Sequence, residues 1–84
     1  MSMLLKTFRG VSMPTFGEHL KSLRKDKKVT QKEVAQKIGA TERTYQHYEA
    51  DTKKPSFENL IALADYFDVS IDYLVGRSDN PQRT

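Results

Sequence analysis

The side chains with the clearest chemical use lie in one short segment, residues 41–50. Arg43, Gln46 and His47 fall on one side of a helical wheel drawn at about 100° per residue, and two tyrosines fall on the other. Arg can donate two hydrogen bonds to guanine, Gln can pair in two places with adenine, and His can donate to an acceptor such as guanine N7. An outward helix face of this kind suits the reading of base edges in DNA.

Two glutamates flank that face, Glu42 and Glu49. The Glu42 carboxylate could accept a hydrogen bond from cytosine N4, which would make it a fourth base-contacting residue. Its place in the first turn also favours the helix dipole, which would make its role structural. The sequence leaves both roles open.

Two short helices must position these side chains. Residues 30–33, Thr-Gln-Lys-Glu, have the form of a capping box, and Gly39 ends the helix where a left-handed residue is needed. Ala35 offers a small side chain where the next helix must cross, and that helix starts at its cap, Thr41, and runs to about Glu49. We therefore expect a helix-turn-helix whose second helix can lie in a DNA major groove.

Three further helices are expected around this pair. The first starts at the capping box of residues 15–18, and the charged run 24–28 that follows its apolar stripe is interpreted as a loop or a frayed end. Ser56 caps a fourth helix, and Ser70 caps a short fifth helix that Gly76 stops. The fourth is the most apolar and is expected at the centre of the core through Phe57, Leu60, Ile61, Leu63, Ala64 and Phe67. No strand pattern competes, so the expected fold class is all-α.

Some aromatic side chains that could carry chemistry are better explained by packing. Tyr45 and Tyr48 could stack on bases, but their spacing places them on the inner side of the third helix. His19 lies beside the apolar stripe of Phe16 and Leu20, so a partly buried structural role is expected for it.

A second set of polar residues is placed to contact phosphates. Gln31 is the first residue of its helix, where free N–H groups attract anions, and it could also brace Gln46. Lysines after the third helix could grip a flanking phosphate, or could belong to a solvated loop. The residues expected to contact phosphates are Gln31, Thr41, Thr44, Lys53 and Lys54.

The composition excludes several classes of protein. The chain has no cysteine and two histidines, which excludes disulfides and leaves no basis for a zinc site, and no cofactor is expected. No apolar run approaches the ~18 residues of a membrane span, and we expect a cytoplasmic protein. There is no nucleophile with a base, no paired carboxylate and no glycine-rich phosphate loop, so an enzyme is not expected.

The charge is unevenly distributed along the 84 residues. Residues 1–54 hold 12 Lys and Arg against 6 Asp and Glu, whereas residues 55–84 hold 2 against 5. A basic half favours a polyanion as partner, although a soluble surface can also segregate its charges by chance.

At this point the chain resembles the Cro/lambda-repressor-type helix-turn-helix regulators, also called xenobiotic response element-type. The resemblance spans about residues 15–76. It rests on Phe16-Gly-Glu-x-Leu-x-x-Leu-Arg24, Gln31-x-x-Val-Ala-x-x-Ile-Gly39, Thr41, Tyr48-Glu49, Pro55-Ser-x-Glu-Asn-Leu60 and Val69-Ser-Ile-Asp-Tyr-Leu-Val-Gly76. It implies a five-helix lambda-repressor-like domain with the helix-turn-helix in helices 2 and 3. By position, the base contacts would be Glu42, Arg43, Gln46 and His47.

Two departures from the family pattern stand out. Tyr45 occupies a position where the family more often has Ile or Val, which predicts slightly altered packing of the third helix. The loop after Glu49 begins Ala50-Asp51 instead of the frequent Asn-Gly, and Asp51 places a negative charge near the expected path of a phosphate.

The resemblance also implies a function and an organisation. The function is sequence-specific binding of double-stranded operator DNA as a homodimer, with transcriptional control that is usually repression. We divide the chain into an N-terminal arm, 1–14, a DNA-binding domain, 15–76, and a tail, 77–84. The expected dimer surface consists of Leu4, Leu5, Phe8, Ile71 and Tyr73. The alternative is a protein-interaction module of the same fold, antitoxin-like or binding an antirepressor.

Overall fold

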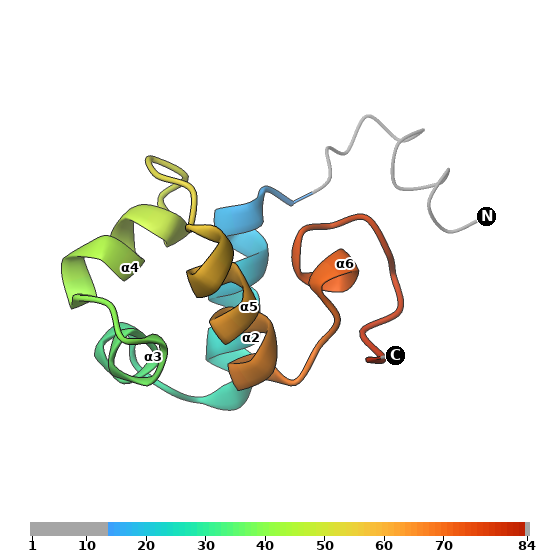
Figure 1. Ribbon diagram of the computed structural model, residues 1–84, viewed down its shortest axis with the longest axis horizontal. Helices are drawn as coiled ribbons and strands as arrows, with labels where there is room; N and C mark the ends of the chain where they lie inside the picture. The colour runs from blue at the N-terminus through green and yellow to red at the C-terminus, as the bar shows by residue number, and fades with distance from the viewer. Residues whose placement is uncertain (1–13, 84) are drawn as a thin grey trace.

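The computed structural model describes residues 14–83, which form five helices, the short connections between them and a segment without helix after the last one (Figure 1). They are α2 (Phe16–Lys27), α3 (Gln31–Ile38), α4 (Glu42–Glu49), α5 (Phe57–Phe67) and α6 (Ile71–Leu74). No strand occurs between residues 14 and 83, so the all-α expectation is confirmed. None of these five helices is both long and apolar enough to cross a membrane.

Every one of these helices begins at a Ser or Thr cap. In each case the side-chain oxygen accepts a hydrogen bond from the backbone N–H three residues further on, at Thr15, Thr30, Thr41, Ser56 and Ser70. Both predicted capping boxes are complete, because Glu18 and Glu33 also accept from the N–H groups of their caps, at 2.9 and 2.8 Å. Each cap contributes about 1 kcal/mol, so the helix starts are fixed locally.

The helix ends follow the prediction less closely. Gly39 ends α3 with φ +75°, as expected. However, the interpretation of residues 24–28 as a loop or a frayed end is wrong, because α2 continues through Lys27 and ends at Lys28, whose φ is +61°. The basic side chains in this last turn suit the negative end of the helix dipole, which offsets their mutual repulsion.

The core is built from all five helices. Its most deeply buried large side chains are Leu20, Val34, Tyr45, Leu63 and Leu74. The prediction that all the apolar residues of α5 belong to this core is wrong for two of them. Phe57 is 72% exposed and Ile61 is 36% exposed, because their spacing of four residues puts them on one face of α5, whereas Leu63 is buried in the core. An apolar pattern predicts that side chains are buried, but it does not identify the surface against which they pack.

A close contact between α2 and the end of α4 depends on Gly17. A Cβ at this position would collide with the backbone carbonyl oxygen of Glu49 and would lie 2.7 Å from Oδ2 of Asp51. The absence of a side chain therefore lets the first turn of α2 approach the segment that leaves α4.

Candidate nucleic-acid interface

The helix α4 lies at one end of the molecule, with α3 packed beside it (Figure 1). Arg43 and Gln46 are exposed, whereas Tyr45 is fully buried and Tyr48 is 4% exposed. The predicted division of α4 into an inner and an outer side is therefore confirmed for these four residues. The Arg43 guanidinium makes no hydrogen bond or ion pair within residues 14–83, so it is available to a ligand.

His47 differs from its two neighbours on this face. It is half-buried, and its Nδ1 lies 2.7 Å from Oγ1 of Thr52 in the following connection. The same Oγ1 lies 3.2 Å from the carbonyl oxygen of His47. A hydroxyl just beyond a helix end carries no signal of its own in the sequence, so this role of Thr52 was not predicted.

Gln46 is held by the helix beneath it. Its Nε2 donates to Oε1 of Gln31 at 3.4 Å, and Nε2 of Gln31 donates to Oε1 of Glu49 at 3.0 Å. The prediction that Gln31 braces Gln46 is confirmed. Since the Gln31 amide is fixed from one side by Glu49, it can orient Gln46 from the other.

The position predicted for Glu49 is wrong, because its side chain is turned inward and does not flank the outer face. Arg24 donates to it twice, from Nε to Oε2 at 2.6 Å and from Nη2 to Oε1 at 3.2 Å. Arg24 also donates from Nη1 to the carbonyl oxygen of Val29 at 3.1 Å. The two charged side chains are 13% and 5% exposed, so this ion pair is largely desolvated.

The electrostatics of this pair favour its charged form. Burial by itself would raise the pKa of Glu49, but the hydrogen bonds it accepts, led by those from Arg24, outweigh burial and lower that pKa. The same hydrogen bonding raises the pKa of Arg24. Burial raises the pKa of Tyr45, whose hydroxyl lies beside the pair but reaches hydrogen-bond geometry with neither partner nor with any other described residue.

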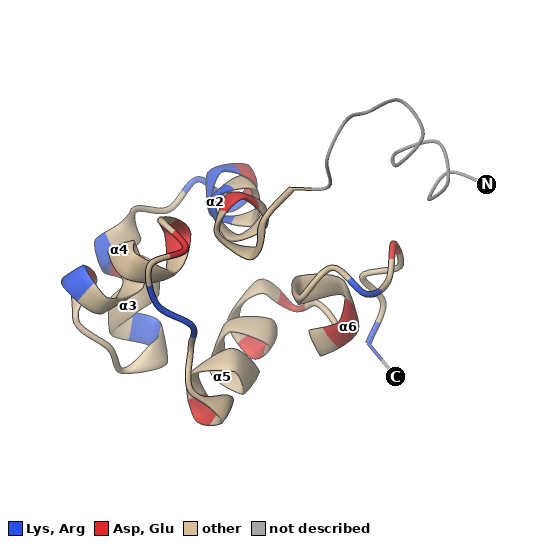
Figure 2. Cartoon of the chain, turned by 90° about the horizontal axis from the view of Figure 1, so that it is seen from above, with Lys and Arg blue, Asp and Glu red and all other residues tan. Residues whose placement is uncertain are grey.

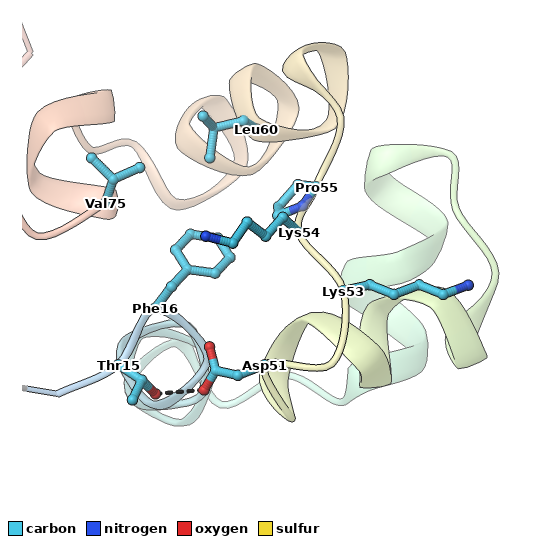
Figure 3. Close-up of a pocket in the computed structure, with 8 residues that line it drawn as sticks. All are labelled: Thr15, Phe16, Asp51, Lys53, Lys54, Pro55, Leu60 and Val75. Atoms are coloured by element: carbon cyan, nitrogen blue, oxygen red, sulfur yellow. Dashed lines mark hydrogen bonds between the residues drawn. The ribbon is translucent and has the colours of Figure 1, made fainter.

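Asp51 holds the chain where it leaves α4. With φ at +61°, it turns back so that Oδ1 accepts from the N–H of Gly17 at 2.9 Å and Oδ2 accepts from the hydroxyl of Thr15 at 2.6 Å (Figure 3). Its negative charge therefore faces the N-terminus of α2, where the helix dipole stabilises it. The sequence predicted a negative charge near the path of a phosphate, and it did not predict the role of Asp51 at α2.

The remaining predicted phosphate contacts lie on the surface around α4. Thr41 is exposed at the start of α4, and its hydroxyl donates to Oγ1 of Thr44 at 3.0 Å. Lys53 and Lys54 are both exposed, but they point in opposite directions (Figure 3). Both lysines line, together with Phe16, a cavity of about 570 Å³.

Charge is segregated over the folded molecule as it is along the sequence. Lys and Arg mark α2, α3, α4 and the connection into α5, whereas α5 itself carries Asp and Glu but no Lys or Arg (Figure 2). The exposed side of α4, with Glu42 in its first turn, thus belongs to the basic part of the described surface.

The sequence profile of a family described as helix-turn-helix matches residues 20–74, which include α3, α4 and the connection between them. The chain belongs to the Cro/C1-type helix-turn-helix family. This family comprises transcriptional regulators and is not a family of enzymes, as the sequence indicated. The fold class predicted from the resemblance is confirmed as well.

Other members of the helix-turn-helix family resemble the chain over most of its length. The HTH-type transcriptional regulator YobD of Bacillus subtilis (strain 168) is 44% identical over 64 residues, which are 76% of this chain and 57% of YobD. The cryptic phage CTXphi transcriptional repressor RstR of Vibrio cholerae serotype O1 is 40% identical over 60 residues, 71% of this chain and 54% of RstR. The chain thus spans about half the length of these relatives.

A solved structure of the same fold has DNA bound to it. The P22 c2 repressor protein, crystallised in complex with synthetic operator 9T, superposes with a TM-score of 0.74 at 27% sequence identity. The superposition covers 79% of this chain and all of that one.

The residues predicted for a dimer surface do not share one environment. Leu4, Leu5 and Phe8 lie outside the described residues. Ile71 is 38% exposed, whereas Tyr73 is half-buried and stacks edge-on against His19, with ring centroids 4.8 Å apart. His19 also approaches the carbonyl oxygen of Leu74, which confirms its structural role.

Proposed function

We propose that this chain binds double-stranded DNA in a sequence-specific manner and regulates transcription as a repressor. The observation that carries the proposal is the pair of exposed side chains Arg43 and Gln46 on α4, one free of partners within the described residues and the other braced by Gln31. A braced amide and a free guanidinium on one helix face match the donor and acceptor pattern of bases in the major groove.

Each candidate residue then has a definite task. Arg43 pairs with guanine, Gln46 pairs with adenine, and His47 and Glu42 contact neighbouring base pairs. The phosphate contacts come from the N-terminal turn of α3 at Gln31, from the hydroxyls of Thr41 and Thr44, and from Lys53 and Lys54. Phosphate contacts fix the position of α4 along the groove, so that the base contacts can distinguish one DNA sequence from another.

Two further observations support DNA as the ligand. Lys and Arg gather around α4, which attracts a polyanion and steers its approach. In addition, the P22 c2 repressor, which has the same fold, was crystallised in complex with an operator.

The proposal includes a homodimer on a near-palindromic operator. Two recognition helices would lie about 34 Å apart, one turn of DNA, and repression would follow from covering the promoter. We add Phe57 and Ile61 to the residues proposed for the dimer surface, because a large apolar side chain such as Phe57, at 72% exposure, favours burial against a partner.

The deciding experiment is a selection of bound sequences from a pool of random DNA. We expect an enriched half-site in two inverted copies, about 10 base pairs from centre to centre. Recovery of DNA without any enriched sequence, or of no DNA at all, would overturn the proposal.

The rival candidate is a protein-interaction module of the same fold, either antitoxin-like and binding a toxin or binding an antirepressor, through its acidic part. The observation in its favour is that α5 carries only acidic charged residues. Salt distinguishes the two candidates, because affinity that rests on phosphates falls steeply with salt concentration, whereas an apolar protein interface is much less sensitive.

A further inference from the structure

The contact between His47 and Thr52 has a consequence for how α4 reads DNA. Oγ1 of Thr52 lies within hydrogen-bond distance of two groups of His47: the ring Nδ1 at 2.7 Å and the backbone carbonyl oxygen at 3.2 Å. A hydroxyl carries one proton, whereas its oxygen can accept as well as donate. The proton of Thr52 can therefore serve one of the two contacts.

Two arrangements of the protons are available. If Thr52 donates to the carbonyl oxygen, Nδ1 carries the ring proton and donates to Oγ1, so both contacts are hydrogen bonds. If Thr52 donates to Nδ1, two oxygens face each other at 3.2 Å with no proton between them. The carbonyl oxygen of His47 accepts from the backbone N–H groups of Thr52, at 3.0 Å, and Lys53, at 3.4 Å, in either arrangement. The first arrangement makes one side-chain hydrogen bond more than the second, and a carbonyl oxygen cannot donate, so the geometry favours a proton on Nδ1.

We propose that Thr52 fixes neutral His47 in the tautomer with the proton on Nδ1, so that Nε2 meets DNA as a hydrogen-bond acceptor. Nε2 has no partner among the described residues, and His47 lies on the same side of α4 as Arg43 and Gln46. An acceptor in the major groove selects an exocyclic amino group, N4 of cytosine or N6 of adenine, and is repelled by N7 and O6 of guanine.

This inference rests on the proposed function and reverses one detail of the sequence prediction. That prediction made His47 a donor to guanine N7, since an isolated imidazole can donate from either nitrogen. The specificity of this position then depends on a residue outside the recognition helix, Thr52, which positions the ring without itself contacting a base.

The test of the tautomer is a two-bond ¹H–¹⁵N correlation spectrum of the uniformly ¹⁵N-labelled full chain at a pH of about 8.5, where imidazoles are neutral. The ring nitrogen without a proton resonates far downfield of the one with a proton. We expect His47 to show the proton on Nδ1. A proton on Nε2 in the wild-type chain would overturn the proposal.

Two variants and an internal reference make the spectrum decisive. Thr52→Val keeps the shape of the side chain and removes the hydroxyl, so the proton of His47 should move toward Nε2, and Thr52→Ser should restore it. His19 is the reference, because its Nδ1 approaches the carbonyl oxygen of Leu74 at 3.2 Å and must carry the proton there in every variant. A His47→Gln variant assigns the signals, since the chain has two histidines.

The test of base choice uses the same variants in a selection from random DNA. We expect cytosine or adenine at one position of each half-site for the wild-type chain, and a loss of that preference of about 2- to 12-fold in Thr52→Val, the ratio that corresponds to one neutral hydrogen bond. An unchanged preference in a folded Thr52→Val variant would overturn the role of the tautomer in reading DNA.

The two proposals fail in different ways. A chain that selects no DNA but carries the His47 proton on Nδ1 refutes the proposed function and the base contact, and leaves the tautomer standing. A chain that selects an operator but carries the proton on Nε2 refutes the tautomer alone.

Discussion

Arg24 and Glu49, which are 25 residues apart in the sequence, are joined by two hydrogen bonds that tie the last residue of α4 to α2. Glu49 also accepts from Gln31, and Gln31 accepts from Gln46, so the connection continues to the outer face of α4. The orientation of a candidate base-reading amide thus rests on a buried ion pair on the other side of the helix.

Removing one member of this pair should be costly. In Arg24→Met the aliphatic stem is kept, but the Glu49 carboxylate, which is 5% exposed, loses its charged partner. We expect the free energy of unfolding to fall by about 3–5 kcal/mol, measured by urea denaturation. The matched control is Lys25→Met on the exposed side of the same helix, which should change it by less than about 0.5 kcal/mol. Equal effects of the two substitutions would contradict the role assigned to the pair.

The same pair predicts how stability depends on pH. The pKa of Glu49 is lower in the folded chain than the unfolded value of about 4.3, so the folded state binds fewer protons between the two values. The stabilisation that comes from the lowered pKa of Glu49 is complete above the unfolded pKa and is lost as the pH falls through the folded pKa. We expect urea denaturation between pH 7 and pH 3 to show a steeper loss of stability below about pH 5 for the wild type than for Glu49→Gln. Parallel curves would show that other carboxylates account for the whole loss.

Gly17→Ala should destabilise the fold although alanine is the better helix former. The new Cβ would meet the carbonyl oxygen of Glu49 and the Asp51 carboxylate, so the first turn of α2 must move away from the end of α4. We expect a loss of about 1–3 kcal/mol, which corresponds to a fall in the melting temperature of at least about 4 °C. Gly39→Ala is the comparison, because it meets no atom within 4 Å and is strained only by its φ of +75°. It should cost about 1–2 kcal/mol and leave the hydrogen bonds of Asp51 unchanged by NMR.

The sequence was informative wherever the determining interaction is local. A Ser or Thr just before a helical pattern marks a helix start, because its side chain accepts a hydrogen bond from an N–H of the first turn and needs no distant partner. All five starts were predicted. The wheel of residues 41–50 likewise separated Tyr45 and Tyr48 from Arg43 and Gln46, because a period of 3.6 residues fixes relative directions within a helix.

The failures involve partners that are distant in the sequence. Nothing local marks Glu49 for Arg24, or Asp51 for the N–H of Gly17, since both pairs form only when α2 and α4 pack. Lys28 adopts φ of +61° without being glycine, so the usual sign of a helix end was missing there. For Phe57 the apolar type predicted burial in the core, but the side chain is 72% exposed.

The exposed apolar residues at the start of α5 lead to a prediction about assembly. Phe57→Asp should weaken the proposed homodimer at least 10-fold, because it replaces an apolar contact with a buried charge on both protomers. Sedimentation equilibrium measures the dimer constant, and the melting temperature at low protein concentration should stay within a few degrees, since Phe57 is outside the core. Glu58→Ala, one residue further on and also exposed, is the control. A dimer constant that is the same in both variants would place the interface elsewhere.

The last prediction separates base reading from phosphate contact on the selected operator. Arg43→Ala should weaken operator binding by about 1–3 kcal/mol and relax base choice at one position of each half-site, because its guanidinium is free to pair with guanine. Lys54→Ala should weaken binding to operator and random DNA alike and reduce the salt slope by about 1 per site. Fluorescence anisotropy across a range of salt concentrations measures both quantities. Equal losses of affinity on operator and random DNA for Arg43→Ala would show that Arg43 does not read a base. An unchanged salt slope for Lys54→Ala would favour Lys53, which points the other way (Figure 3), as the phosphate contact.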